Sequence, residues 1–392
     1  MARILLAWEL GGGYGHLASL RIAARQLRTA GHDCLFAVRL LENAAEFLEP
    51  ELGPALQAPV RLGNGRNPVE LQLSYASLLH NVGFDDPTGL SARIAAWREL
   101  MRTWKVDQLV VDHSPIALIA ARSLGIPVAA IGSGFDLPPL KHPYPSFQPW
   151  APVPETQLLR NEEQVLLELN SALQRLGLAP YENLQAIYAG CARGLLTYPE
   201  LDHYDTPRAE PYLGLPDYSL GAAPTWPAGN APRVLAYLRS HPQLEAMLKA
   251  LSASKARVLL RIAEIEPEKI RPWLRPGFEV IGQSINLHQA AQECEAYLHY
   301  AAHGTVAEML LAGKPGVLWP DNLERSLVAR RAEQLGAAVV APRQGAFDVG
   351  AALEQALSDT ALRHGAEKFA QRYRVHSRTT IPQKLLERLL PG

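Results

Sequence analysis

The sequence predicts an α/β fold made of two domains, each built on a doubly wound parallel sheet. Short apolar runs alternate with segments of helical spacing in both halves of the 392-residue chain, which is typical of a parallel sheet covered by helices on both faces. A proline-rich stretch at residues 207–232 separates the halves. A chain of this length is expected to form two or three domains, and its 48% of apolar residues can supply a core to each.

The first half begins with a βαβ unit. Residues 3–8 form a short apolar run that ends at glycines, as a buried strand does. Apolar residues at helical spacing follow: Leu17, Leu20, Ala24 and Leu27. Gly31 is a typical helix stop, and residues 34–38 form the next strand. The alternation recurs at residues 108–131, so one parallel sheet is expected here.

The second half repeats this alternation. Strands are expected at residues 234–238, 258–262, 278–281, 297–300 and 317–319. Helices are expected near residues 243–252, from Val306 onward, and over residues 367–390. In the first half, residues 138–154 carry seven prolines among aromatic side chains. This composition predicts an ordered but irregular loop that could wall a pocket.

Composition and charge exclude several classes of protein. The 38 Lys and Arg residues nearly balance 39 Asp and Glu, so no general field attracts nucleic acid or an anionic membrane. Cys34, Cys191 and Cys294 are odd in number and far apart, which argues against a disulfide framework or a zinc site. The opening apolar run is too short for a secretory signal, and no stretch is long enough to span a membrane. We therefore expect a soluble cytoplasmic protein.

A glycine-rich turn follows the first strand. Residues 11–16 read Gly-Gly-Gly-Tyr-Gly-His and lead into a helix, and such a turn lets the backbone approach a negatively charged ligand. A dinucleotide-binding fingerprint fits poorly, because His16 stands where the third glycine is needed and no acidic residue ends the second strand near Arg39. A nicotinamide-dependent enzyme is therefore disfavoured.

His16 and Asp112 are candidates for acid–base chemistry. A histidine has an ordinary pKa of about 6.5, so its imidazole can take a proton from a hydroxyl at neutral pH. Asp112 follows the predicted strand at residues 108–111, and open α/β sheets collect their sites at the carboxyl ends of strands. The two side chains could therefore meet as a base and the group that orients it. The alternative is that each of them caps an adjacent helix.

A second strand-to-helix turn lies at residues 297–305. The free backbone N–H groups at the start of its helix make it a second candidate phosphate site. Thr305 and Glu308 have the spacing of a capping box. His299 and His303 lie four residues apart, but the small residues between them and Gly304 break the helix that a metal pair would need. No metal site is expected.

These two regions together resemble glycosyltransferases of the GT-B type that use nucleotide sugars. Gly15-His16, the apolar helix and Gly31-His32 are similar to the family's GH…RGH opening. Residues 304–320, followed by a helix to Leu335-Gly336, resemble the family's donor-binding signature GT-x-x-E-x-L-x-x-G-x-P. The resemblance spans most of the chain.

The resemblance implies an architecture of two Rossmann-like domains that face each other across a cleft. An acceptor-binding domain would span residues 1–215, and a linker would follow at 216–232. A domain that binds the nucleotide sugar would span residues 233–375. The last residues, 376–392, would form a helix that packs back on the N-terminal domain.

The resemblance also implies roles for individual residues. His16 would be the general base of an inverting, metal-independent transfer, and Asp112 would orient it. Glu308 would bind the ribose, and Thr305 with the backbone at Gly304 would bind the diphosphate. The implied donor-binding set is Gly13, Arg239, Ser240, Ile285, His299, His303, Gly304, Thr305, Glu308, Glu324 and Arg325, and the implied acceptor-binding set is Tyr14, Phe135, Tyr144, Phe147 and Trp150.

Three positions depart from the family pattern. Tyr300 stands where the family has a phosphate-binding histidine, and a neighbouring histidine could take its place. Glu324-Arg325 stands where an Asp-Gln or Glu-Gln pair holds the hydroxyls of the donor sugar. Arg239 replaces a glycine, and its guanidinium could bind a phosphate.

The expected protein is therefore a hexosyltransferase-like enzyme without a bound cofactor. Its co-substrate would be a nucleotide-diphosphate sugar, with UDP or TDP as the nucleotide. The acceptor would be a small molecule, a lipid or a peptide, and neither nucleic acid binding nor stable membrane insertion is expected. Two alternatives stay open: a nucleotide-sugar epimerase or hydrolase of the same fold, and a non-catalytic partner that binds a nucleotide sugar.

Overall fold

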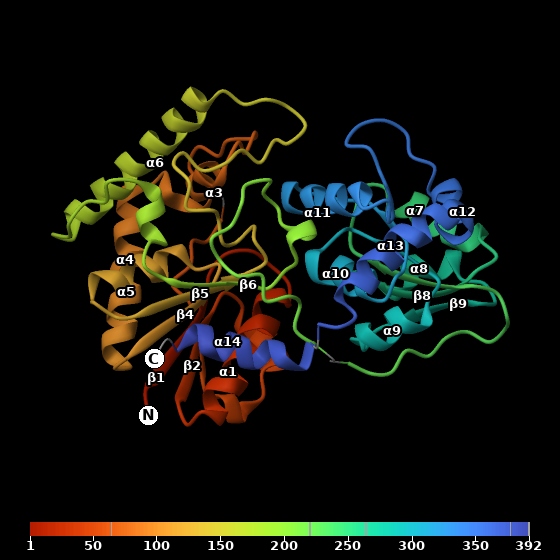
Figure 1. Cartoon of the computed structure of the whole chain (residues 1–392), viewed down its shortest axis with the longest axis horizontal. Coiled ribbons are helices and arrows are strands. Elements are labelled where there is room, and N and C mark those ends of the chain that lie inside the picture. Colours follow the sequence, from red (N-terminus) through yellow and green to blue (C-terminus); the bar gives the residue numbers. More distant parts are fainter. Residues whose placement is uncertain (64, 219–220, 263–264, 377, 391–392) are drawn as a thin grey trace. The chain divides into compact units, whose positions relative to one another are not determined.

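The chain divides into two compact units. The computed structural model describes residues 1–63, 65–218, 221–262, 265–376 and 378–390. The first unit contains Met1–Tyr198, Asp202–Pro216 and the C-terminal segment from Arg378, and the second contains Pro199–Leu201 and Asp217–Ser377. Figure 1 labels the elements of both.

The first unit is built on a parallel sheet of six strands in the order β3-β2-β1-β4-β5-β6. The strands are β1 (Arg3–Trp8), β2 (Asp33–Val38), β3 (Ala55–Gln57), β4 (Gln108–Asp112), β5 (Val128–Gly132) and β6 (Ala192–Leu195). In the centre, Ala7 of β1 lies opposite Ala37 of β2 and Val111 of β4. The side chains from Ile4 to Trp8 are fully buried, as expected for a strand covered on both faces.

Helices cover both faces of this sheet. They are α1 (Gly15–Thr29), α2 (Leu41–Phe47), α3 (Tyr75–Leu79), α4 (Pro87–Thr103), α5 (Pro115–Ser123), α6 (Glu155–Arg175) and α14 (Ile381–Leu389), with short helical turns η1 (Pro50–Leu52), η2 (His80–Phe84), η3 (Leu184–Ile187) and η6 (Arg378–Thr380). The last helix of the chain, α14, lies beside α1 and contacts β6 (Figure 1). The C-terminal segment is thereby part of the first unit.

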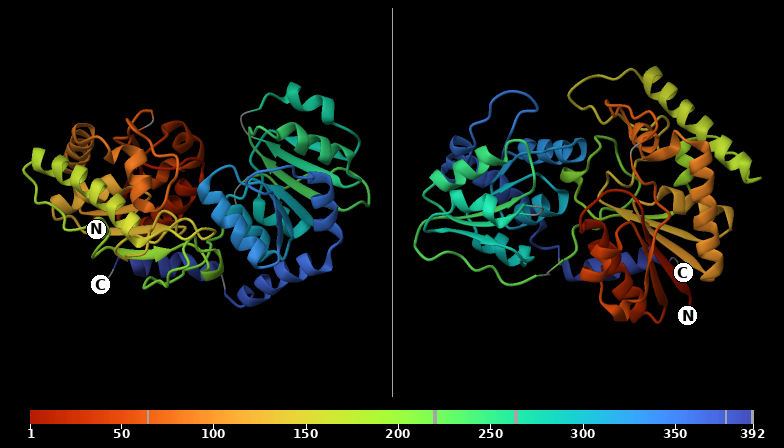
Figure 2. Two further views of the ribbon diagram at one scale, coloured as in Figure 1. Left: turned by 90° about the horizontal axis from the view of Figure 1, so that it is seen from above. Right: turned by 180° about the vertical axis from the view of Figure 1, so that it is seen from behind.

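The second unit has a sheet of the same kind, in the order β12-β11-β10-β7-β8-β9. The strands are β7 (Arg233–Leu238), β8 (Arg257–Ile262), β9 (Phe278–Ile281), β10 (Ala296–His299), β11 (Gly316–Leu318) and β12 (Ala338–Val340). The helices are α7 (Leu244–Ala253), α8 (Pro267–Ile270), α9 (Leu287–Glu293), α10 (His303–Leu311), α11 (Leu323–Gln334), α12 (Val349–Ser358) and α13 (Thr360–Tyr373), with turns η4 (Pro199–Leu201) and η5 (Arg271–Trp273). Figure 2 shows helices on both faces of the sheet.

Both sheets have the strand order of a Rossmann fold. Taken in chain order within its own unit, each sheet runs 3-2-1-4-5-6, and the paired strands of the described residues run parallel. The prediction of two doubly wound α/β domains is confirmed. This order places a topological switch point between β1 and β4 in the first unit and between β7 and β10 in the second, and ligands bind at such points.

The structure differs from two expectations about connections. From Asp217 on, the segment expected to be a linker, 216–232, belongs to the second unit, because Ala222 bridges Ile285 and the Trp226 indole N–H donates to Glu293 at 2.7 Å. Residues 219–220 of that stretch lie outside the described residues. The single tail helix expected over 367–390 is wrong: α13 ends at Tyr373 and α14 begins at Ile381, where a proline in the first turn starts a new helix.

Candidate functional site

The first candidate site lies at the switch point of the first sheet, where β1, β4 and β5 end. The glycine-rich turn after β1 leads into α1, whose second residue is His16. Asp112 is the last residue of β4. Residues 96 positions apart in the sequence are thereby brought to one edge of the sheet.

His16 and Asp112 form a hydrogen-bonded pair. His16 Nδ1 lies 2.7 Å from Asp112 Oδ1, and the side chains are 15% and 3% exposed. Because the carboxylate can only accept, Nδ1 is the protonated nitrogen and the lone pair is left on Nε2. The ring of Trp8 stacks on the imidazole at 5.5 Å between centroids and fixes its plane. An imidazole held in this way is able to accept a proton on Nε2.

The glycine turn leaves room for His16. Gly11 has a φ of +83°, and a Cβ built on it would collide with Nε2 of His16. Gly13 also has a positive φ of +78°, but a Cβ there would meet nothing within 4 Å. Gly11 is therefore required both by its backbone and by the position of the imidazole.

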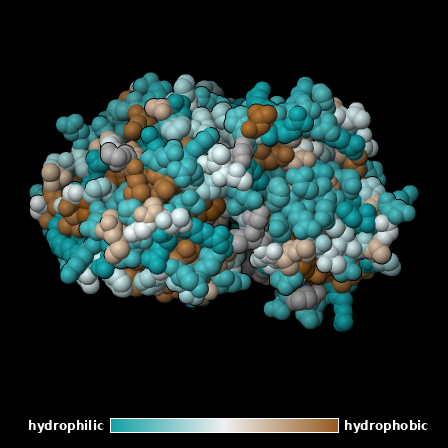
Figure 3. Space-filling view, turned by 60° about the horizontal axis from the view of Figure 1, so that its bottom comes forward, coloured by the Kyte–Doolittle hydropathy of each residue, from teal (hydrophilic) through white to brown (hydrophobic). Residues whose placement is uncertain are grey.

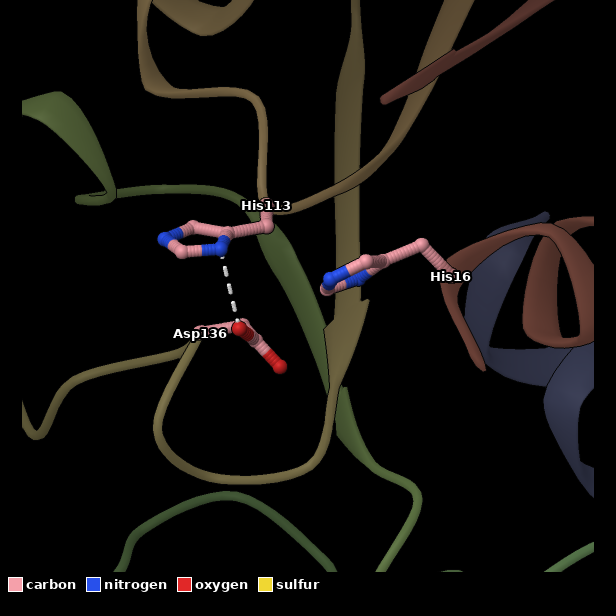
Figure 4. A group of neighbouring side chains, drawn as sticks. All are labelled: His16, His113 and Asp136. Carbon is pink, nitrogen blue, oxygen red and sulfur yellow. Dashed lines mark ion pairs between the residues drawn. The ribbon is translucent and has the colours of Figure 1, made fainter. Parts of the chain in front are cut away.

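A second histidine and aspartate lie beside this pair. Nδ1 of His113 is 3.0 Å from Oδ1 of Asp136, and both side chains are buried, at 5% and 10% exposed. Figure 4 shows this pair with the ring of His16 next to it, and the two imidazole centroids are 5.8 Å apart. His113 has a φ of 54°, a left-handed conformation that is strained for a histidine.

His113 and Asp136 were not among the site residues predicted from the sequence. His113 directly follows Asp112, and Asp136 lies in the turn after β5. The rule that sites gather at the carboxyl ends of strands applies to β5 as it does to β4. That rule would have drawn attention to Asp136 once the strand at residues 128–131 was recognised.

The two aspartates differ in their electrostatic surroundings. Burial raises the pKa of Asp112, and the hydrogen bond from His16 only partly opposes this. Burial also acts on Asp136, but His113, His16 and the Ser133 hydroxyl, which donates to it at 2.8 Å, together lower its pKa well below the usual range. Asp136 is therefore the more firmly ionised carboxylate of the group.

Glu9, which directly follows β1, is a buried carboxyl group at the same edge of the sheet. It is 1% exposed, accepts a hydrogen bond from the Ile116 backbone N–H at 2.7 Å and another from the Trp97 indole at 2.9 Å. Burial raises its pKa to about 7, although these hydrogen bonds oppose the shift. Its carboxyl group holds the start of α5 in place, next to Asp112 and His113.

The aromatic residues expected to bind the acceptor fall into two groups. Tyr144 and Phe147 are fully buried; Tyr144 packs edge-on against Tyr75, and Phe147 stacks on Phe135 at 4.9 Å. Tyr14 and Trp150 are 36% and 38% exposed. Tyr144 and Phe147 therefore build the core of the unit in this structure, whereas Tyr14 and Trp150 present accessible surface.

The second candidate site lies at the switch point of the second sheet. Arg239 follows β7, Tyr300 follows β10, and Asp321 and Arg325 come after β11. The guanidinium groups of Arg325 and Arg239 lie 4.5 Å and 5.8 Å from the centroid of the Tyr300 ring. Asp321 pairs with Arg325 and lies 3.8 Å from Nε of Arg239. Two cations thus lie around one carboxylate at this edge of the sheet.

Helix α10 points its N-terminus toward this edge of the sheet. The expectation of a capping box at Thr305 and Glu308 is wrong, because α10 begins at His303 with Ala302 as its N-cap residue, which offers no side-chain cap. Thr305 lies inside the first turn. A Cβ built on Gly304 would meet nothing within 4 Å. The first backbone N–H groups of α10 are therefore placed as in an anion-binding helix start.

The remaining residues of the implied donor-binding set are spread around this point. Glu308 is 4% exposed and pairs with His288 of α9 at 2.8 Å. His299 is buried at the end of β10, where burial and the nearby Arg325 keep its pKa well below the usual range, so it is neutral. The others have these positions: Ser240 is exposed after β7, Ile285 is half-buried beside the start of α9, His303 opens α10, and Glu324 lies in the first turn of α11. Gly13 belongs to the first unit.

Among the described residues, one group could hold a metal ion: His16, His113 and Asp136. In the described part of the chain, none of the helices combines the length and the hydrophobicity that a membrane-spanning segment needs. In Figure 3, hydrophilic residues cover most of the visible face, and hydrophobic residues form scattered patches.

The fold is that of known glycosyltransferases. The glycosyltransferase VinC, solved in complex with dTDP, matches 100% of this chain and 100% of its own with a TM-score of 0.71 and 19% identity. The calicheamicin glycosyltransferase CalG4 matches 99% of this chain and 98% of its own, with a TM-score of 0.71 and 18% identity. The spinosyn rhamnosyltransferase SpnG, solved with spinosyn aglycone, matches 98% of this chain and 100% of its own, with a TM-score of 0.68 and 17% identity.

These matches define the class of structure. The matches extend over nearly the full length of this chain, which has the GT-B fold of two Rossmann-like domains, as the sequence resemblance implied. No protein-family model matches the sequence, and no curated protein matches it in a sequence search. At identities below 20%, the likeness concerns the fold, and the activity has to be argued from the two sites.

Proposed function

We propose that this protein is a glycosyltransferase that moves a sugar from a nucleotide-diphosphate sugar to an acceptor hydroxyl, with inversion at the anomeric carbon and without a metal. The observation that carries the proposal is the hydrogen-bonded pair of His16 and Asp112 at the switch point of the first sheet, in a chain with the GT-B fold. The GT-B fold favours sugar transfer from a nucleotide sugar, and the pair of His16 and Asp112 offers a general base for that transfer.

His16 would act as the general base. Asp112 accepts the Nδ1 proton, so Nε2 carries the lone pair that removes the proton from the acceptor hydroxyl. The acceptor oxygen then bonds to the anomeric carbon while the bond from that carbon to the phosphate oxygen breaks. The proton ends on Nε2, and the buried carboxylate of Asp112 stabilises the imidazolium that forms.

The second site would bind the leaving nucleotide. Negative charge grows on the diphosphate as the glycosidic bond stretches, and the N-terminus of α10 can stabilise it. Arg239 and Arg325 add positive charge at the same edge of the sheet. Both guanidinium groups lie against the Tyr300 ring, and a planar guanidinium binds an anionic oxygen through its fixed N–H donors. The site thus supports diphosphate binding without a metal.

The neighbouring structures suggest the nature of the substrates. VinC is described in complex with dTDP, and SpnG with thymidine diphosphate and with an aglycone. We infer a TDP or UDP sugar as the donor and a small hydroxylated molecule as the acceptor. Lipid or peptide acceptors, the cytoplasmic location and the absence of nucleic acid partners stay predictions.

Calorimetric titration tests the nucleotide site. UDP, TDP and GDP are titrated into the full-length protein, with magnesium or with EDTA. We expect saturable binding of one nucleotide that survives chelation, and at least a tenfold weaker affinity in Arg325→Gln because a charge-assisted contact is lost. The variant Arg363→Gln, which removes a guanidinium from α13 away from this cluster, is the control. Absence of binding by every nucleotide would refute the proposal.

Product analysis separates transfer from the related reactions of the same fold. A transferase releases nucleoside diphosphate only when an acceptor is present, and the sugar appears on the acceptor. A hydrolase would release free sugar, and an epimerase would return a changed nucleotide sugar, in both cases without an acceptor.

A further inference from the structure

The proposed sugar transfer uses His16 and Asp112, one of two histidine–aspartate ion pairs found among the described residues of the first unit. His113 and Asp136 have no part in the mechanism above, although they are buried within the same group as His16. A pair of this kind needs its own explanation, because burying a carboxylate and an imidazole together is costly unless their charges are balanced.

We propose that His16, His113 and Asp136 form a binding site for a divalent transition-metal ion, with Zn²⁺ as the natural occupant. One ligand atom from each of the three residues lies within 4.8 Å of the others. Nδ1 of His113 and Oδ1 of Asp136 are 3.0 Å apart. Neighbouring ligands on a tetrahedral zinc ion, with bonds of about 2.0 to 2.1 Å, are separated by about 3.3 Å. His113 and Asp136 are thus already spaced as co-ligands. To reach the same separation from them, the ligand nitrogen of His16 has to move by at most about 1.5 Å, the difference between 4.8 Å and about 3.3 Å.

The orientation of His16 also fits a metal ligand. Asp112 accepts the Nδ1 proton, which leaves Nε2 as the coordinating nitrogen and forms a carboxylate–histidine–metal arrangement. Figure 4 shows a ring nitrogen of His16 turned toward His113 and Asp136. Asp136 has an outer partner as well, because the Ser133 hydroxyl donates to Oδ2 at 2.8 Å and leaves Oδ1 toward the histidine.

Charge and burial favour a cation at this point. Asp136 and the adjacent Asp112 are two buried carboxylates. Together with the two imidazoles in their neutral form they carry a charge of −2, which one divalent ion neutralises. Nδ1 of His113 faces Oδ1 of Asp136 at 3.0 Å, in a side chain that is 95% buried. This nitrogen can coordinate an ion once its proton is released, as metal binding requires. Two imidazoles favour zinc, copper or nickel over magnesium or calcium.

Occupancy of this site would inhibit sugar transfer. Three protein ligands leave the fourth position of a tetrahedral ion open. However, the ion would occupy the lone pair on Nε2 of His16, which the proposed transfer needs. Only this consequence rests on the proposed function, since metal binding itself does not require that the protein transfers sugar.

The test is a spectroscopic titration of the metal-free, untagged full-length protein with Co²⁺, followed by displacement with Zn²⁺. We expect one ion per chain and the visible absorption of tetrahedral cobalt. Asp136→Asn and His113→Gln should each weaken Co²⁺ binding by more than tenfold, and Asp112→Asn by about tenfold through the lost orientation of His16. His142→Asn is the matched control, because His142 also faces a carboxylate, Glu162 at 2.9 Å, but lies outside the group.

Two results would overturn the proposal: no Co²⁺ binding by the wild type, or binding that Asp136→Asn and His113→Gln leave unchanged while both retain the wild-type melting temperature. Nucleotide binding is measured on the same samples. Metal binding without nucleotide binding would refute the proposed function alone, and nucleotide binding without metal binding would refute this site alone.

Discussion

Asp112 is the residue whose removal best separates orientation from proton transfer. It holds Nδ1 of His16 at 2.7 Å and is almost completely buried. In Asp112→Asn, the amide can turn its N–H₂ toward Nδ1 and favour the wrong tautomer, so the lone pair leaves Nε2. We predict a fall in kcat of about 100-fold or more with unchanged affinity for the nucleotide. Steady-state kinetics and calorimetry check the two halves of this prediction, and an equal loss of nucleotide affinity would contradict it.

Gly11 is predicted to be essential for activity. In Gly11→Ala the new Cβ would collide with Nε2 of His16, and the φ of +83° would be strained. The imidazole must therefore move, and we expect at least a tenfold lower kcat. Gly12→Ala is the control, since a Cβ there meets nothing within 4 Å and the backbone is not left-handed. Similar kcat values for the two variants would show that the turn tolerates a side chain beside His16.

Glu9 makes the stability of the first unit depend on pH. Burial raises its pKa from 4.5 to about 7, so the folded state binds this proton more tightly than the unfolded chain does. The stability contributed by the proton is complete below pH 4.5 and is lost as the pH rises to 7, by about 3 kcal/mol. Glu9→Gln cannot titrate and should lose this part of the dependence. Urea unfolding at pH 5 and pH 8 measures it, and equal pH dependence in both proteins would contradict the assignment.

At the scale of the elements, α14 is predicted to stabilise the first unit from the end of the chain. It lies beside α1 and contacts β6, and Leu385 is fully buried there. Leu385→Ala should lower the free energy of unfolding by about 2 to 5 kcal/mol, because it leaves a cavity. Lys384→Ala, on the exposed face of the same helix, should have little effect. Urea denaturation compares them, and equal effects would mean that α14 adds little to the core.

The elements also show what local sequence patterns predict well. The apolar runs ending at Trp8 and Val111 became central strands, because a strand buried on both faces has a distinctive composition. The start of α10 was placed wrongly, because the spacing of Thr305 and Glu308 fits a capping box although Ala302 is the actual N-cap. The break between α13, which ends at Tyr373, and α14, which begins at Ile381, was also missed. The residues at which a helix begins and ends depend on tertiary packing, which short sequence patterns do not show.

At the scale of the molecule, the strand order explains why only half of the first site could be predicted. The pairing of His16 with Asp112 followed from the rule that sites collect at strand ends and from the resemblance to a known family. His113 follows β4, and Asp136 lies in the turn after the neighbouring strand β5, where the two side chains meet. The rule about strand ends could have indicated Asp136, but no sequence spacing places it against His113. The cluster of Arg239 and Arg325 on Tyr300 likewise depends on the adjacency of β7 and β10, which are far apart in the chain.

The most direct test of the central claim measures the release of nucleoside diphosphate from UDP and TDP sugars in the presence of EDTA. The assay compares the wild type with His16→Ala, with and without a panel of small hydroxylated acceptors. We predict release that requires an acceptor, survives chelation and slows by at least about 100-fold in His16→Ala, with unchanged nucleotide affinity. Equal release by both proteins, or release that needs no acceptor, would contradict the account.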